Sequence, residues 1–524
     1  MRAGLKTAAL VLALLLPLVA WPTPAVLTIG NGTEPESLDP QKATGVSAGN
    51  VLRDLYEGLT GVSPGGSIVP AAAESWQWSD DGRRLQLRLR EGLRWANGDP
   101  LTAEHYASGL RRLLDPATAS GYANLFAAIE HGREVLAGRL PPSALGLRAE
   151  DARTLTIGLE RPMPNLPALL AHPAASPIHP ADLVGDPKPD ARIGNGAYRL
   201  AEWALQSRIT LVRNRNYWND RQTAIGEVRY LPTEDLNSEL KRYRAGELDV
   251  TTSVPSTQAD WIRRTFGNEL HVATYLGSYF YGLNLTRPPF AGNKPLRQAL
   301  SMAIDRQAIA TKVLHALATP AWSYIPPGIR DYTPQVPGWA QWPRGQREAE
   351  AQRLYAAAGY SAAKPLQVEI RYNTSDDHKR IAVVIAAMWK QVLGAEVTLV
   401  NEEWKVFLQR RRERRDTQAF RNTWIADSDD ALGFAEILGT AHPRNDSGYA
   451  DAGYDALLHE AGEARDLWLR REKLEAAERQ MLDDAPIVPI YFYASKHLVK
   501  PRVDGWQDNI LDWHYSKDLR LRER

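Results

Sequence analysis

From Leu27 onward the chain alternates short runs of hydrophobic and polar residues with segments of helical spacing. Within residues 84–90 every second residue is a leucine, and this period of two predicts a strand with one buried face. Residues 154–159 predict a second strand. Behind Pro295 the hydrophobic residues recur with helical spacing, which predicts an amphipathic helix that runs towards Leu317. Strands and helices mixed in this way are typical of an α/β fold.

The first residues have the pattern of a secretion signal. Two basic residues precede an apolar run at residues 7–20, which is shorter than the ~20 residues needed to span a bilayer. Small residues favour cleavage after Ala25, with Ala20 as a competing position. We therefore predict that residues 1–25 are a signal peptide and that the protein is exported.

Size and charge restrict the architecture and the partners. A chain of 524 residues exceeds the roughly 250–300 residues at which single cores stop growing, so we expect two or three lobes. The chain has 63 Lys and Arg against 62 Asp and Glu, and a formal charge of +1 gives no field that would attract nucleic acid. The arginine-rich run at residues 410–415 is predicted to be the solvated end of a helix, and no nucleic-acid partner is expected.

The chain contains no cysteine. This excludes disulfides, thiolate metal sites, a cysteine nucleophile and a lipid-modified N-terminal cysteine. An exported protein without such an anchor stays with the cell only where an outer membrane retains it. The expected location is therefore the periplasm of a Gram-negative cell, without a lipid anchor.

One motif could indicate catalysis. Residues 45–49, Gly-Val-Ser-Ala-Gly, match the G-x-S-x-G spacing of serine hydrolases, which expose the serine between a strand and a helix. The preceding residues 37–41 are turn-like, and the sequence has neither a His-Gly-Gly oxyanion motif nor H-E-x-x-H. We expect no metal, no cofactor and no enzymatic activity. An exported hydrolase that uses Ser47 or a pair of carboxylates is the alternative.

Several segments along the chain form a larger pattern. They include Trp-Ala-Asn-Gly-Asp-Pro at residues 95–100 and Tyr-Arg-Ala-Gly-Glu-Leu-Asp at residues 243–249. The others are residues 36–40, 53–59, 73–76, 195–198, 372–379 and 488–491. In this order the segments resemble the peptide-binding group of periplasmic solute-binding protein family 5, the oligopeptide-binding proteins of peptide ABC importers. The resemblance covers essentially the whole mature chain.

The resemblance implies an α/β fold of the type II, two-lobed periplasmic-binding-protein class, with an extra third domain. Hinge motion would close the two lobes around a ligand. The implied boundaries are residues 26–56, 182–276 and 494–524 for lobe I, residues 57–181 for domain II, and residues 277–493 for lobe III.

The resemblance also implies charged anchors for the two ends of a peptide. Asp427 aligns with the family aspartate that forms a charge-assisted bond with the ligand's amino group. Arg421, His378 and Arg411 align with groups that bind the ligand's carboxylate, directly or through water. The planar fork of arginine matches this group.

Two backbone segments correspond to strands that flank the ligand in the family, so we expect the peptide to be held as an added β-strand. Their residues are Thr44, Gly45 and Val46 in one segment and Thr423, Trp424 and Ile425 in the other. Trp404 and Trp424 align with aromatic residues that line the side-chain pockets.

Three positions depart from the family pattern. The lysine that can bind a peptide carboxylate falls at Leu314, so one expected anchor is missing. The family's cysteine pair falls at Gly277 and Ile425. One additional residue ahead of Arg421 shifts the alignment around Arg411.

Together these features predict a periplasmic receptor that encloses short peptides and delivers them to an inner-membrane ABC permease. We expect it to be a monomer. A receptor specialised for cell-wall (murein) peptides is a close alternative. Receptors for nickel, heme or sugars share this fold and form a third hypothesis.

Overall fold

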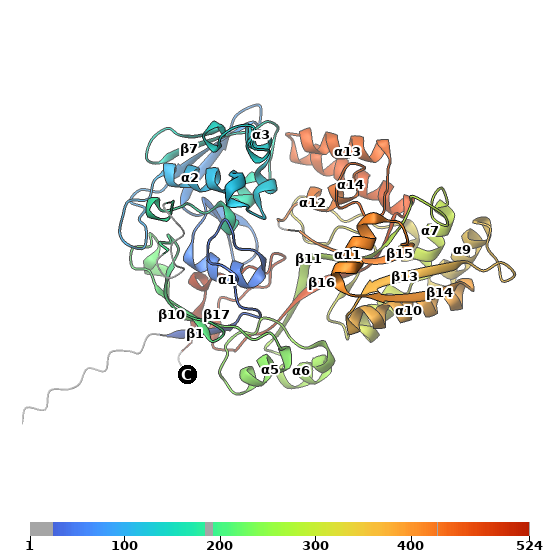
Figure 1. The fold of residues 1–524 in the computed structure, drawn as a ribbon. Coiled ribbons are helices and arrows are strands. Elements are labelled where there is room, and N and C mark those ends of the chain that lie inside the picture. Colours follow the sequence, from blue (N-terminus) through green and yellow to red (C-terminus); the bar gives the residue numbers. More distant parts are fainter. Residues whose placement is uncertain (1–24, 184–191, 427, 523–524) are drawn as a thin grey trace, which may run out of the picture.

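A computed structural model describes residues 25–183, 192–426 and 428–522, except for the side chains of residues 376, 404 and 405. Figure 1 shows two lobes side by side with two long strands between them. These crossover strands are β11 (Leu270–Leu283) and β16 (Ile487–Leu498), which pair in antiparallel orientation. The predicted signal peptide, apart from Ala25, lies outside the described residues.

The first lobe, lobe I, contains a four-stranded sheet, one helix that packs on it, and the C-terminal segment. Its elements are β1 (Val26–Gly30), α1 (Gly45–Leu55), β8 (Tyr198–Ala204), β9 (Arg208–Arg213), β10 (Glu227–Leu231), β17 (Val503–Asp504) and β18 (Arg520–Leu521). The strand order is β1-β10-β9-β8, with β1 parallel to β10 and the other neighbours antiparallel. Val499, Val503 and Leu519 join the core under this sheet, so the C-terminal segment is part of lobe I.

The upper part of the same side of the molecule, domain II, has a separate sheet and a separate hydrophobic core. The sheet has the order β4-β5-β7-β6 and is antiparallel. Its elements are β4 (Ala73–Trp78), β5 (Arg84–Leu89), α2 (Ala103–Leu114), β6 (Leu147–Ala149) and β7 (Thr154–Gly158). Leu85, Leu87 and Leu89 are fully buried while their neighbours on β5 are exposed, which confirms the strand predicted from the period of two.

The second lobe, lobe III, is built on a six-stranded mixed sheet with the order β12-β16-β11-β15-β13-β14. The additional strands are β12 (Thr319–Pro320), β13 (Gln367–Asn373), β14 (Glu396–Glu402) and β15 (Ala419–Ile425). Its longer helices are α7 (Lys294–Met302), α9 (Arg344–Ala357), α10 (Asp376–Leu393), α11 (Trp404–Glu413), α13 (Ala452–Glu463) and α14 (Leu467–Asp484). β11 and β16 are inner strands of this sheet, so the two strands that connect the lobes are also part of the core of lobe III.

The helix predicted to run from Pro295 towards Leu317 is interrupted. α7 ends at Met302, and a new turn starts with α8 (Arg306–Ala308), followed by a π-helical turn at Ile309–Val313. The Asp305 carboxylate accepts a hydrogen bond from the backbone N–H of Ala308 (3.0 Å) and caps the new turn. This aspartate competes for helical N–H groups, so the prediction of one continuous helix was wrong.

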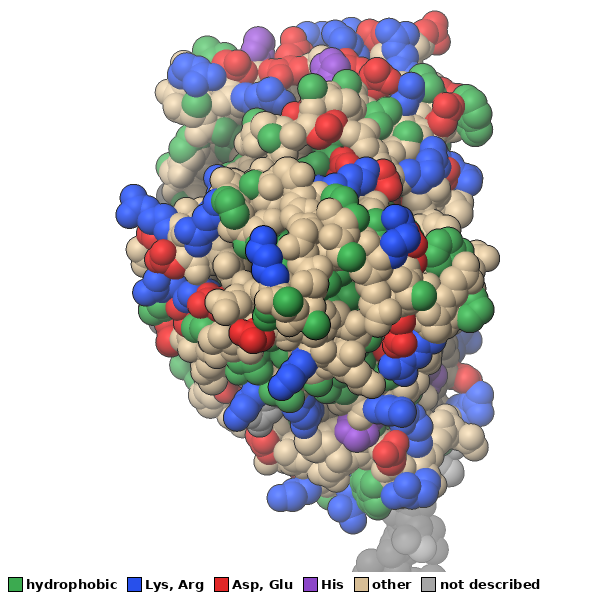
Figure 2. Space-filling model, turned by 90° about the vertical axis from the view of Figure 1, so that its right-hand side faces the viewer, with side chains coloured by type: hydrophobic (Ala, Val, Ile, Leu, Met, Phe, Trp, Pro, Cys, Tyr) green, Lys and Arg blue, Asp and Glu red, His purple; other side chains and the backbone are tan. Residues whose placement is uncertain are grey.

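Within the part of the chain that the structure describes, no helix is both long and apolar enough to cross a membrane. Figure 2, which faces the outer side of lobe III, shows Lys and Arg side chains interspersed with Asp and Glu. This agrees with the near-neutral charge of the sequence.

Candidate functional site

A cavity of about 160 Å³ lies where the two lobes and domain II meet. Lobe I contributes the start of α1 and residues 511–513 of the C-terminal segment. β11 contributes Tyr275 and Leu276, and the end of β15 contributes Ile425 and Ala426. Because both lobes supply its walls, the cavity changes shape whenever the lobes move relative to each other.

The predicted residues at the start of α1 reach this cavity, but they do not form a strand. Thr44 is the N-terminal cap residue of α1, and Gly45 and Val46 belong to the helix, so the expectation of a flanking strand here was wrong. The Thr44 hydroxyl donates to Glu36 (2.6 Å) instead of capping the first turn. The first N–H groups of an α-helix have no partner within the helix, so this end presents donors towards the cavity.

Two apolar side chains face the cavity from its opposite sides. Val46 on α1 is 58% exposed, and Ile425 at the end of β15 is 44% exposed. Large hydrophobic side chains such as valine and isoleucine are normally buried in a helix or a sheet. Their exposure to a shared cavity indicates a surface that a ligand or closure of the lobes covers.

β15 presents a free edge next to the cavity. It pairs with β11 along its whole length, from Ala419 to Ile425, but it pairs with β13 only at Ala419 and Phe420. In the described part of the chain, residues 421–425 therefore have no strand on their other side. An edge of this kind is a template for an extended peptide.

Three buried polar atoms on this part of β15 have no hydrogen-bond partner among the described residues. They are Arg421 Nε, Thr423 Oγ1 and Trp424 Nε1. Buried polar atoms of folded proteins are nearly always paired, and exceptions require an explanation. These groups lie on the strand with the free edge, where a bound molecule could satisfy them.

Arg421 and Arg411 differ sharply in their surroundings, although both are only 6% exposed. The guanidinium of Arg411 forms an ion pair with Asp446 (2.9 Å) and donates to Asn422 Oδ1 (2.8 Å). The guanidinium of Arg421 lies over the Tyr279 ring at 5.3 Å and forms no ion pair with a described carboxylate. Arg421 is therefore a buried charge on β15 that no described carboxylate compensates.

His378 lies beside this arginine, at the start of α10. Its Nδ1 is 3.4 Å from the Tyr279 hydroxyl, and the two rings are 5.5 Å apart. Burial and the nearby Arg421 charge lower the pKa of His378 from 6.5 to about 3. The structure thus brings Arg421 and a neutral His378 together beside the Tyr279 ring.

Other predicted positions have mixed outcomes. Asp427 and the side chain of Trp404 lie outside the described residues. Trp424 is partly buried, with the guanidinium of Arg444 at 5.7 Å from its ring. Gly277 and Ile425, the positions of the family's cysteine pair, face each other in the β11–β15 ladder, and Leu314 is buried in the core of lobe III.

Ser47 is not arranged as a nucleophile. It lies in the first turn of α1, and its Oγ is 3.2 Å from the hydroxyl of Thr33. Among the described residues no histidine forms a hydrogen bond with it. The strand and sharp turn that expose a catalytic serine are also missing, since residues 31–44, which directly precede α1, form no strand.

One wall of the cavity consists of residues that the sequence analysis did not identify. Tyr122 and His172 of domain II pack at 4.4 Å between ring centres, and Arg53 of α1 lies 5.0 Å from the Trp513 ring. Burial, with the Arg53 charge, lowers the pKa of His172 to about 3, so this ring is neutral at physiological pH. Four distant segments supply these residues, and no local pattern distinguishes them.

The fold and the cavity define a two-lobed protein that binds a ligand between its lobes. Three comparisons with known proteins agree with this class. Residues 67–446 match the family model described as "Bacterial extracellular solute-binding proteins, family 5 Middle". The periplasmic oligopeptide-binding protein OppA of Salmonella typhimurium is 37% identical over 501 residues, which cover 94% of this chain and 92% of the relative.

Two solved structures are also similar. The periplasmic murein tripeptide-binding protein MppA in an unliganded open form gives a TM-score of 0.87 at 34% identity, covering 95% of this chain and 97% of that chain. The complex of Haemophilus influenzae OppA with RPPGFSPFR gives a TM-score of 0.76 at 35% identity, covering 95% of this chain and 99% of that chain. Since the identities are nearly equal, the higher score indicates that the two lobes lie closer to the open arrangement.

The chain belongs to the bacterial extracellular solute-binding proteins of family 5. The expected type II, two-lobed α/β fold with an extra domain is confirmed. The named relatives are periplasmic binding proteins, which agrees with the expected compartment.

Proposed function

We propose that the protein is a periplasmic receptor that encloses short peptides between lobes I and III and delivers them to an ABC importer of the inner membrane. The names of its relatives support peptides as the ligand class. In this proposal residues 1–25 are a cleaved signal peptide, and the mature protein is a monomeric, non-enzymatic receptor without a lipid anchor.

The free edge of β15 is the observation that carries the proposal. A peptide that pairs with residues 421–425 would satisfy backbone groups without regard to its side chains. The Thr423 N–H already donates to the Asn422 side chain (2.8 Å), so this bond would be exchanged for one to the ligand. Affinity for the backbone explains how one site accepts many sequences.

The charges at the edge fix the direction of the peptide. The carboxylate end lies at Arg421 and His378, because Arg421 is a buried cation on the free edge and forms no ion pair with a described carboxylate. A carboxylate there accepts charge-assisted hydrogen bonds in a site from which closure of the lobes removes water. Asp427, which follows β15 in the sequence, binds the amino end in this proposal. Arg411 stays paired with Asp446 and acts only indirectly.

A double-mutant cycle tests this assignment. The affinity of one tripeptide, with a free or an amidated carboxyl end, is measured by calorimetry for the wild type and for Arg421→Ala. We expect either change alone to cost about 2–5 kcal/mol, and the second change to cost little once the first is present. Arg410→Ala, which removes a half-exposed arginine of α11, is the control and leaves both affinities unchanged.

Additive losses in the cycle would show that Arg421 does not bind the carboxylate.

A pool of mixed peptides incubated with the protein tests the hydrolase alternative. Peptides recovered intact support a receptor, whereas peptides cleaved by the wild type but not by Ser47→Ala contradict it. Selective binding of murein peptides from the pool would identify the cell-wall variant.

A further inference from the structure

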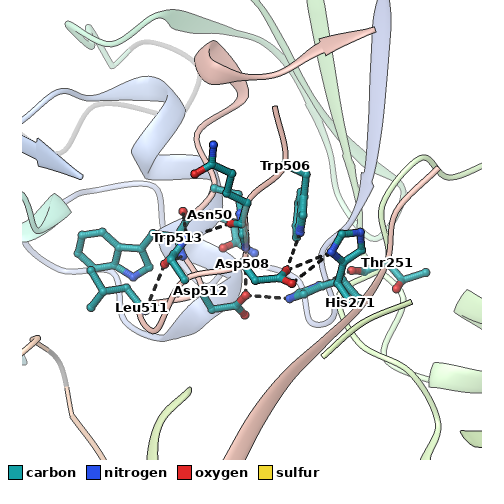
Figure 3. Close-up of polar contacts among 12 residues, drawn as sticks. Asn50, Thr251, His271, Trp506, Asp508, Leu511, Asp512 and Trp513 are labelled. Carbon is teal, nitrogen blue, oxygen red and sulfur yellow. Dashed lines mark hydrogen bonds and ion pairs between the residues drawn. The ribbon is translucent and has the colours of Figure 1, made fainter. Parts of the chain in front are cut away.

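Three metal-ligating side chains converge at the base of crossover strand β16, on the side of lobe I. His497 is on β16, whereas Asp512 and His514 belong to the C-terminal segment. One donor atom of each residue lies within 4.8 Å of the other two. Figure 3 shows Asp512 in this segment, with Trp506 and the His271 ring of β11 nearby.

The backbone orients the ring of His497. Its Nδ1 is 2.8 Å from the carbonyl oxygen of Thr251, which can only accept, so Nδ1 carries a proton. Its Nε2 is 2.9 Å from Asp512 Oδ1. In the neutral ring Nε2 offers a lone pair, and a lone pair and a carboxylate oxygen at this distance repel each other. The geometry requires a proton or a metal ion between them.

His514 brings a second imidazole nitrogen to the same carboxylate oxygen. Its Nε2 is 3.1 Å from Asp512 Oδ1. The ring stacks on Trp506 with 3.6 Å between ring centres and an angle of 17° between the planes. The stack holds the plane of the imidazole, as contacts outside the ligand shell do at established metal sites.

The three side chains also border a cavity of about 50 Å³, together with Thr251 and Trp506. This volume exceeds the roughly 10–15 Å³ that one water molecule requires. The donors therefore have space in front of them for an ion and a water ligand. The backbone of Asp512 has φ 55°, a left-handed conformation that residues other than glycine seldom adopt.

We propose that His497 Nε2, His514 Nε2 and a carboxylate oxygen of Asp512 bind one divalent cation of the Zn²⁺, Ni²⁺ and Cu²⁺ class. Imidazole ligands select these ions, whereas Ca²⁺ and Mg²⁺ prefer oxygen ligands alone. Zinc bonds of about 2.0–2.2 Å place the ligand atoms of a tetrahedral site about 3.3 Å apart. The present separations of 2.9 and 3.1 Å need to widen by only a few tenths of an ångström.

The ion would join a crossover strand to the C-terminal segment of lobe I. Leu511, Asp512 and Trp513 also line the interlobe cavity, so the metal site lies directly behind one wall of the cleft. It uses neither Arg421 nor His378, and it is therefore independent of the proposed peptide anchors.

Calorimetric titration of ZnCl₂ into untagged, chelator-treated mature protein tests the site. We expect one equivalent of zinc to bind and to raise the melting temperature. His514→Ala and Asp512→Asn should each weaken binding by more than about 10-fold. His271→Ala is the matched control, because His271 contacts Trp506 and Asp508 but is not one of the proposed metal ligands. This variant should bind zinc as the wild type does.

Copper gives a second measurement, and its wild-type spectrum does not depend on the stability of any variant. Nitrogen couplings from two imidazoles in the electron paramagnetic resonance spectrum of the wild-type Cu²⁺ complex would support the site, and their reduction to one in His514→Ala would assign it. Wild-type protein that binds no stoichiometric zinc, or zinc binding that survives in both His514→Ala and Asp512→Asn, would overturn the proposal. In that case the cluster is an ion pair only.

Discussion

At the residue scale, the direction that we propose for the bound peptide rests on Arg421. Two arginines of the cleft are equally buried, but Asp446 neutralises Arg411, whereas no described carboxylate neutralises Arg421. A buried charge without a partner destabilises the fold, and a bound ligand of opposite charge removes this cost. The family resemblance identified both arginines as candidates for binding the ligand's carboxylate. It could not show that only Arg411 has an ion-pair partner, because Asp446 is distant in the chain.

The acidity of His378 gives a pH dependence at this scale. Its pKa is about 3 in the free protein, and a ligand carboxylate at Arg421 would cancel the repulsion that contributes to this low value. Binding then raises the pKa of His378 towards its ordinary value, so the complex takes up a fraction of a proton at mildly acidic pH. We expect affinity to increase as the pH falls from about 7 to about 5.

Calorimetry in buffers of different ionisation enthalpy measures this proton uptake. His378→Gln keeps a hydrogen-bonding side chain and should abolish the uptake. An unchanged uptake in this variant, or none in the wild type, would show that His378 does not sense the ligand.

At the scale of elements, the alternation of hydrophobic and polar residues predicted the strand β5 correctly, whereas helical spacing did not predict where α7 ends. The leucines of β5 follow the period of two because one face of the sheet is buried. The break after Met302 depends on the Asp305 cap, whose carboxylate accepts a hydrogen bond from the Ala308 N–H. Such caps are local competitions for N–H groups that hydrophobic periodicity does not record.

α2 provides a test of close packing between elements. A Cβ atom added at Gly109 would lie 2.3 Å from the carbonyl oxygen of Ser176 and 3.1 Å from the Cα atom of Pro177. Gly109→Ala must displace backbone, so we expect a loss of about 1–3 kcal/mol in the free energy of unfolding. Urea unfolding followed by circular dichroism measures this change.

Gly345, in the first turn of α9, is the matched control. An added Cβ atom there meets nothing within 4 Å. Because alanine favours helices over glycine, Gly345→Ala should be neutral or stabilising by up to about 1 kcal/mol. Equal effects of the two substitutions would contradict the packing of α2 against residues 176–177.

At the scale of the whole molecule, the sequence predicted the two-lobed fold through its resemblance, and composition alone predicted only several lobes. The domain boundaries stay a prediction, which the three larger sheets, one in each predicted unit, support. The His497–Asp512–His514 cluster was missed because the chain brings β16 and the C-terminal segment together only in three dimensions. For the same reason the aromatic wall of the cavity gave no signal.

The paired crossover strands explain how such a receptor works. β11 and β16 are central strands of the lobe III sheet, and their other ends connect to lobe I. The lobes can therefore turn about this pair while each keeps its own core. In the arrangement described, the free edge of β15 is open to an incoming strand, and closure would bring the first turn of α1 towards it.

Native mass spectrometry of protein purified without denaturation tests the capture of peptides in the cleft most directly. The proposal predicts a complex that releases intact short peptides of varied sequence on unfolding, and fewer of them from Arg421→Ala. Release of a single non-peptide molecule, or peptide occupancy that Arg421→Ala leaves unchanged, would contradict it.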